Sequence, residues 1–253
     1  GPVGALRATG FVASTDKQYT SNIQFYDKQM ARQQNLYATN FKTKGVTSHM
    51  VLKNTSDTPV VARPKFLPAN GLAGNSLSLP PVTVAPQHSV EVDLRALQTS
   101  NDLDVVSVQV ESDGANGALI GALSSLDNNG VTRAIPLRDS GAKRNSTGGY
   151  PWKIEGDYTT VVTITNIGEY PTKFVARVNY DGGGYSFAKK ELALGESVTY
   201  DLKKIRDEQV PDKDGNLLPR NISSGQFHWS LVDGRGLGRL IGRTEVVSQK
   251  KNV

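Results

Sequence analysis

The side chains that most often perform catalysis are sparse and scattered in this chain of 253 residues. The three histidines, His49, His88 and His228, lie far apart in the sequence. A metal site or an acid–base pair requires such groups to come within reach of one another. The serine-hydrolase pattern G-x-S-x-G and the zinc-protease pattern H-E-x-x-H do not occur. The sequence therefore predicts a protein that is not an enzyme and that uses no cofactor.

One acidic segment, residues 212–216, begins like a calcium-binding loop. The EF-hand pattern requires glycine at the sixth position and glutamate at the twelfth, where this chain has Leu217 and Ser223. Two interpretations stay open, a plain Asp-Gly turn and an irregular calcium site whose candidate ligands are Asp212, Asp214 and Asn216.

Four aromatic residues are the candidate ligand-binding side chains. Tyr150, Trp152 and Tyr158 cluster in a stretch that reads as a linker, and Tyr185 follows the segment Asp181–Gly184. That glycine-rich segment lacks the lysine and the helix of a phosphate-binding loop, so a hairpin turn is expected there. Aromatic rings in such places either fix the angle between two modules or offer flat apolar faces on which sugar rings stack.

Composition limits the partners. The net charge is +5, but the basic residues are scattered, so nucleic acid is not an expected partner. Cysteine is absent, which excludes disulfides and cysteine metal sites. No apolar run is long enough to span a membrane. The opening pair Gly1-Pro2 resembles the remnant of a removed purification tag, so we expect the native N-terminus and any export signal to lie upstream.

An internal repeat dominates the organisation of the chain. Residues 51–59 and 163–171 both read as a strand ending in asparagine, a polar turn and then proline, 112 residues apart. Residues 84–94 match 192–202 at a spacing of 108. A further motif occurs three times, at residues 4–8, 117–121 and 238–242. Ordered matches of this kind indicate duplicated structural modules.

The repeat predicts three segments along the chain. Residues 1–44 are expected to be the tail strands of a preceding, partial repeat together with a linker. Residues 45–156 are expected to form the first β-sandwich module and residues 157–253 the second, with an inserted loop at 210–221.

Each module shows short runs of β-branched and alternating residues separated by turn dipeptides such as Asp113-Gly114 and Asp233-Gly234. In the first module we expect strands near 48–54, 59–67, 76–84, 88–94, 104–112, 117–125 and 131–137. Single helical turns are expected at 94–97 and 202–207. The predicted fold class is all-β, with tandem immunoglobulin-like or fibronectin-like β-sandwich modules.

The runs Val162–Gly168 and Leu192–Val198 resemble bacterial immunoglobulin-like modules of the cell-adhesion-related (CARDB-like) family. In that family a strand ends in Asn-x-Gly and a later strand follows a turn similar to L-x-P-G-E-S. The first module departs from this pattern, because residues 54–56 lack the glycine and residues 86–88 lack Gly-Glu. The resemblance implies an extracellular or envelope location and a scaffold or adhesion role.

We therefore expect a non-enzymatic secreted or cell-envelope protein of bacterial origin with a structural, adhesion or protein-interaction role. The expected partners are proteins or glycans at the cell surface. The alternative is a carbohydrate-binding accessory region of a larger exported enzyme.

Overall fold

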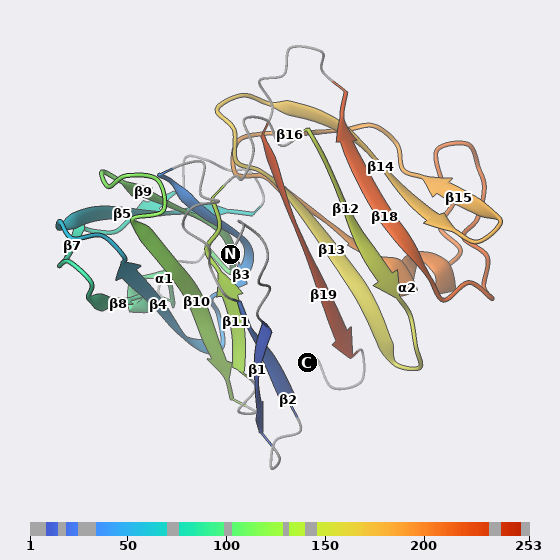
Figure 1. The fold of residues 1–253 in the computed structure, drawn as a ribbon. Helices are drawn as coiled ribbons and strands as arrows, with labels where there is room; N and C mark the ends of the chain where they lie inside the picture. Colours follow the sequence, from blue (N-terminus) through green and yellow to red (C-terminus); the bar gives the residue numbers. More distant parts are fainter. Residues whose placement is uncertain are drawn as a thin grey trace, which may run out of the picture. The chain divides into compact units, whose positions relative to one another are not determined.

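The computed structural model describes residues 9–14, 19–24, 34–69, 76–98, 103–128, 132–139, 146–232 and 239–248 (Figure 1). Antiparallel strands form almost all of the regular structure in these ranges, which confirms the all-β prediction. The chain divides into two compact units. Unit 1 comprises residues 1–66 and 77–141, and unit 2 comprises residues 67–76 and 142–253. In the described part of the chain, no helix is long and apolar enough to cross a membrane.

Unit 1 contains two larger sheets, with strand orders β11-β10-β4-β8 and β3-β9-β5-β6, and β7 also pairs with β5. Its elements are the hairpin strands β1 (Thr9–Ser14) and β2 (Tyr19–Gln24), then β3 (Leu36–Lys42), β4 (Val46–Asn54), β5 (Val60–Pro68), β6 (Leu77–Ser78), β7 (Val82–Val84), β8 (Ser89–Asp93), α1 (Arg95–Gln98), β9 (Val105–Ser112), β10 (Leu119–Asp127) and β11 (Thr132–Pro136). Strands β4 to β11 overlap those expected from the sequence, with the run 76–84 divided into β6 and β7, whereas β1, β2 and β3 were not among the strands expected for the first module.

Unit 2 contains the sheets β17-β13-β19 and β12-β18-β14-β15, and β16 also pairs with β14. Its elements are β12 (Thr147–Lys153), β13 (Tyr158–Asn166), β14 (Thr172–Tyr180), β15 (Gly183–Ser186), β16 (Lys190–Leu192), β17 (Ser197–Asp201), α2 (Leu202–Asp207), β18 (Ser224–Leu231) and β19 (Leu240–Ser248). The segment Leu67–Ser76 also belongs to this unit, where the Ser197 amide donates a 2.9 Å hydrogen bond to the Ala69 carbonyl.

Each unit has its own apolar core, made from inward-facing residues of both of its sheets. Alternation along the strands explains this arrangement, because successive side chains of a strand point to opposite faces. In β14, for example, Phe174, Ala176 and Val178 are buried, whereas Lys173 and Arg177 are exposed. The layered arrangement is sandwich-like.

The two units share one pattern of strand pairing. The central strand β4 lies between β8 and β10, as β13 lies between β17 and β19. The second sheet of each unit shows the same correspondence. Strand β9 lies between β3 and β5, and β18 lies between β12 and β14. The helical turns α1 and α2 follow the corresponding strands β8 and β17.

Strand pairing moves the expected boundaries of the modules. Strand β3 pairs with β9, so it belongs to unit 1 and not to a preceding repeat that ends at residue 44. Strand β12 pairs with β18, so the division falls near residue 141 and not after residue 156. The motif copy at residues 4–8 lies outside the described residues.

Candidate functional site

The four candidate aromatic residues do not form one exposed group. Trp152, on β12, is only 2% exposed and belongs to the core of unit 2. It lies opposite Gly225 of β18, where a Cβ on the glycine would stand 2.9 Å from the indole nitrogen. On the same pair of strands, Gly148 lies against the indole of Trp229 in the same way. Each tryptophan therefore fills the space above a glycine, and a ring buried in this manner has no face for a sugar.

Tyr185 is also a core residue, with 2% of its surface exposed. Its hydroxyl donates to the carbonyls of Val210 and Pro211 at 3.2 and 3.3 Å. Burial, with a smaller contribution from the Asp212 charge, raises the pKa of this phenol. The ring packs edge-on against Phe187 at 5.0 Å between centroids. Tyr185 thus fixes the loop after α2 to the hairpin β14–β15.

Tyr150 and Tyr158 are placed differently. Tyr150, on β12, is half-buried against the core, and its ring lies so close to Gly242 of β19 that a side chain there would collide with it. Tyr158, at the start of β13, is 50% exposed. Of the four candidates, Tyr158 offers the largest exposed aromatic surface.

In the acidic loop, backbone amides bind the carboxylate of Asp212, which is one of the candidate calcium ligands. Asp212 Oδ1 accepts hydrogen bonds from the amides of Asp214 and Asn216 at 2.9 and 2.8 Å, and Oδ2 accepts from Ser186 at 3.1 Å. Partial burial opposes ionisation of Asp212, but these N–H groups outweigh it and hold its pKa below the ordinary value. The carboxylate of Asp214 pairs with Lys213 at 2.7 Å. The observed turn is of the Asx type.

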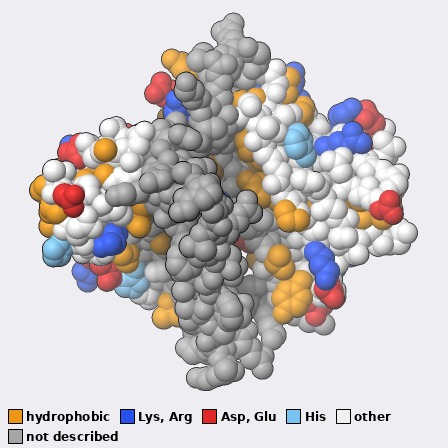
Figure 2. Space-filling view, in the orientation of Figure 1, with side chains coloured by type: hydrophobic (Ala, Val, Ile, Leu, Met, Phe, Trp, Pro, Cys, Tyr) orange, Lys and Arg blue, Asp and Glu red, His pale blue; other side chains and the backbone are white. Residues whose placement is uncertain are grey.

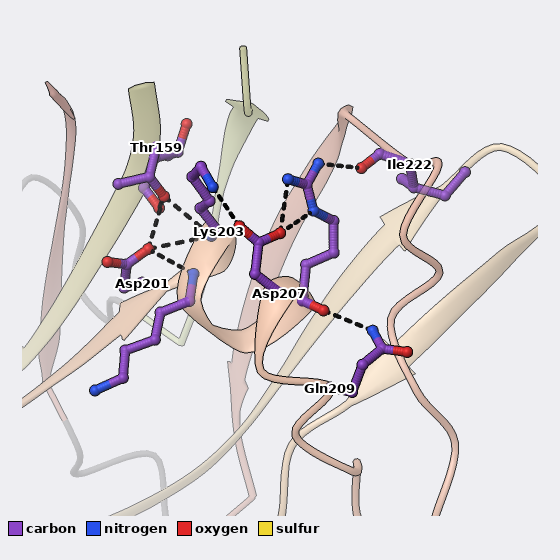
Figure 3. Close-up of polar contacts among 9 residues, drawn as sticks. Thr159, Asp201, Lys203, Asp207, Gln209 and Ile222 are labelled. Carbon is purple, nitrogen blue, oxygen red and sulfur yellow. Dashed lines mark hydrogen bonds and ion pairs between the residues drawn. The ribbon is translucent and has the colours of Figure 1, made fainter. Parts of the chain in front are cut away.

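A polar network surrounds α2 (Figure 3). The helix begins after Asp201, whose Oδ1 accepts hydrogen bonds from the amides of Lys203 and Lys204, both at 3.1 Å. The hydroxyl of Thr159 donates to the same oxygen at 2.7 Å and accepts from the Lys203 amide at 3.0 Å. Asp201 is therefore an N-cap that also joins the helix to β13.

The other end of α2 is held to the loop that follows it. Asp207 pairs with both Lys203 and Arg206, and Arg206 donates to the Ile222 carbonyl at 3.1 Å. The hydrogen bond from Lys203 lowers the pKa of Asp207, and Arg206 acts in the same direction against partial burial. Gln209 donates to the carbonyls of Arg206 and Leu218 at 2.6 and 3.0 Å. The side chains of Asp207, Arg206 and Gln209 thus hold α2 against the loop that follows it.

The outer face of the sheet β12-β18-β14-β15 is different, because polar side chains project from it. Phe227 and Trp229 point into the core, so their neighbours on β18 point outward. We call the outward group the polar face and define it as Thr147, Arg177, Asn179, Gln226 and His228. Figure 2 shows one side of unit 2, where pale-blue histidine, blue basic and red acidic side chains lie among other side chains and backbone drawn in white. The motifs of the sequence do not reveal this face, although period-two alternation around the buried aromatic residues could have found it.

His228 lies at the centre of the polar face, directly opposite Gly149 on one side and Arg177 on the other. Its Nε2 is 2.8 Å from the hydroxyl oxygen of Thr147, and this hydroxyl donates its proton to the Trp229 carbonyl at 2.9 Å. A hydroxyl has a single proton, so Nε2 of His228 must be the donor in their shared hydrogen bond. In the neutral ring, Nδ1 is then left as an acceptor.

Glycines on the flanking strands leave room for the larger side chains of the polar face. A Cβ at Gly149 would lie 3.2 Å from Gln226 Nε2, and one at Gly184 would collide with the guanidinium of Arg177. The side chain of Arg177 therefore lies across β15 at Gly184. Within the described residues, no group accepts a hydrogen bond from this exposed guanidinium.

The remaining histidines lie in unit 1. His49 pairs with Glu91 at 2.5 Å across β4 and β8, and His88 lies 2.6 Å from the Pro86 carbonyl in a turn. The two histidines therefore have separate partners. In the described ranges, no group of three or more His, Cys, Asp or Glu side chains is arranged to hold a metal ion.

Comparisons with known proteins give a distant structural neighbour. No family model matches the chain, and no curated protein matches it. A search of solved structures finds a likeness to the CupB2 chaperone of Pseudomonas aeruginosa, with 14% sequence identity. The alignment covers 79% of this chain and 91% of that one, with a TM-score of 0.20. This similarity is too low to support an argument about fold or function.

Proposed function

We propose that this chain is a non-enzymatic, exported bacterial protein whose tandem immunoglobulin-like units act in adhesion or interaction at the cell envelope. The polar face of unit 2 is the observation that supports it. Charged, imidazole and amide side chains project there from the outward side of an antiparallel sheet. The duplicated strand pairing of the two units and the resemblance to adhesion-related modules support the same role.

The proposal also accounts for the other polar clusters. The groups around α2 and Asp212 are occupied by backbone and side-chain partners of their own unit, so they serve the fold. On the polar face, the five side chains come from three adjacent strands and share one exposed surface. Thr147 is bonded within the sheet to His228 and to the Trp229 carbonyl, whereas the exposed side chains of Arg177 and Gln226 extend outward and can contact a partner.

Binding by the full chain to a panel of immobilised extracellular proteins and glycans tests this function. We expect a panel member to bind, and we expect the triple variant Arg177→Gln/Gln226→Ala/His228→Ala to lose that binding. The variant Arg63→Gln changes the same residue type on β5, the strand of unit 1 that corresponds to β14, and should bind like the wild type. A chain that binds nothing on the panel, or that releases products from hydrolase substrates, would contradict the proposal.

A further inference from the structure

We infer that the polar face of unit 2 binds a carboxylated polysaccharide of the uronic-acid type, with Arg177 as the carboxylate ligand. The inference rests on the proposed function and names the partner of its surface. The first step is the guanidinium of Arg177, which extends over Gly184 and has no hydrogen-bond acceptor among the residues that the structure describes. A guanidinium presents a planar fork of N–H donors that matches the two oxygens of a carboxylate.

The second step concerns the neighbours of Arg177. Asn179 lies opposite Gln226, and their amide groups are able both to donate and to accept hydrogen bonds. His228 adds an acceptor at Nδ1, because Thr147 holds its Nε2. Sugar hydroxyls also donate and accept, so these side chains suit a hydroxyl-rich ligand that has an occasional negative charge.

Charge density separates this ligand from more highly charged polymers. Within the polar face, Arg177 is the residue with a permanent positive charge. Two lysines on the outward side of the same sheet have carboxylate partners: Lys173 lies 3.5 Å from Glu191, and Lys153 pairs with Glu155. A densely sulfated chain would meet few cations here, whereas one carboxylate per sugar matches the single guanidinium.

The dimensions of the face fit an extended ligand. The strands β12, β18, β14 and β15 lie side by side, so neighbouring backbones at about 4.8 Å give a width of about 14 Å. Gly149 and Gly184 lie on the two outer strands, and the side chains of Gln226 and Arg177 occupy the space above them. A polysaccharide that crosses the sheet would therefore contact these two side chains.

The experiment measures binding of the full chain to polygalacturonate, neutral dextran and dextran sulfate at physiological ionic strength. We expect polygalacturonate to bind and dextran to show no binding. Arg177→Gln should weaken the binding of polygalacturonate by about tenfold or more, because a charge-assisted bidentate contact is lost. Arg177→Lys should restore only part of it, and Arg63→Gln should leave it unchanged.

Three results would overturn the inference. Polygalacturonate that does not bind is the first, and equal effects of Arg177→Gln and Arg63→Gln are the second. Tighter binding of dextran sulfate, reduced equally by both variants, would show general attraction to charge. A different outcome separates this inference from the proposed function. If the wild type bound an immobilised protein, the triple variant lost that binding, and polygalacturonate did not bind, the proposed function would be supported and the polysaccharide partner would be wrong.

Discussion

At the scale of single residues, Asn54 and Asn166 show how one buried amide fixes the same connection in both units. Each is fully buried at the end of a central strand. Asn166 donates to the carbonyls of Tyr170 and Leu192 at 2.8 and 2.9 Å and accepts from the Gly168 amide at 2.9 Å. Asn54 makes the corresponding bonds in unit 1. The sequence match at these asparagines thus reflects a shared hydrogen-bonding requirement of the turn.

Asn166→Asp should lower the free energy of unfolding by about 3 kcal/mol, because a buried charge would face two carbonyl oxygens that have lost their donor. Urea denaturation followed by tryptophan fluorescence measures the change. Asn221→Asp, at an exposed turn position, is the matched control and should change stability by no more than about 0.5 kcal/mol. Equal, small effects of both substitutions would show that the buried amide is dispensable.

Residue types alone were a poor guide to the candidate site. Tryptophan and tyrosine suggested an exposed stacking surface, yet Trp152 and Tyr185 fill the core of unit 2. Whether a ring is buried or exposed depends on the face of the strand from which it projects. For Trp152, this face is set by the pairing register that places it opposite Gly225. Register is set by long-range pairing, so the local sequence around residue 152 does not determine it.

At the scale of elements, the sequence predicted most strands and both helical turns. Alternation in β8 and β9 and β-branched residues in β13 were sufficient, because they match the period of a half-buried sheet. Strand β12 was missed as a member of its unit, since its residues Gly148, Gly149 and Pro151 are typical of turns. Its strand character comes from pairing with β18 and not from propensity.

The α2 element gives a prediction about pH. The pKa of Asp207 is lowered in the fold, so its contribution to stability is fully present above the unfolded value of 3.8 and is lost as the pH falls through the folded value. Asp207→Asn should therefore destabilise the protein at neutral pH by about 1 kcal/mol or less, since its carboxylate is partly exposed. The difference from wild type should shrink as the pH falls below about 4.

Thermal unfolding of the two proteins across a pH series provides the measurement. Asp181→Asn, which alters an exposed carboxylate in the turn after β14, serves as the control. A difference between Asp207→Asn and wild type that stays constant at acidic pH would show that the ion pairs of Asp207 do not stabilise α2.

At the scale of the whole molecule, duplication explains why fold prediction succeeded better than site prediction. Corresponding strands of the two units bury corresponding positions. These shared positions are visible in the sequence as repeated motifs. The outward side chains differ between the units: at the position of Arg177, the corresponding strand of unit 1 has Lys65. A comparison between repeats therefore points to the fold and not to the recognition surface.

Because each unit has its own core, damage to one should remain local. Hydrogen–deuterium exchange of Asn166→Asp should show faster exchange in peptides from β13, β14 and β18, with peptides from β4 and β9 unchanged. Asn54→Asp should give the reverse pattern. Faster exchange throughout the chain in either variant would mean that the two cores unfold as one cooperative body.

The segment Leu67–Ser76 has a practical consequence for work on this protein. A gene fragment that starts at residue 142 would encode a second half lacking the stretch whose Ala69 carbonyl accepts the Ser197 amide. Such a fragment would leave the Ser197 amide, at the first residue of β17, without this acceptor.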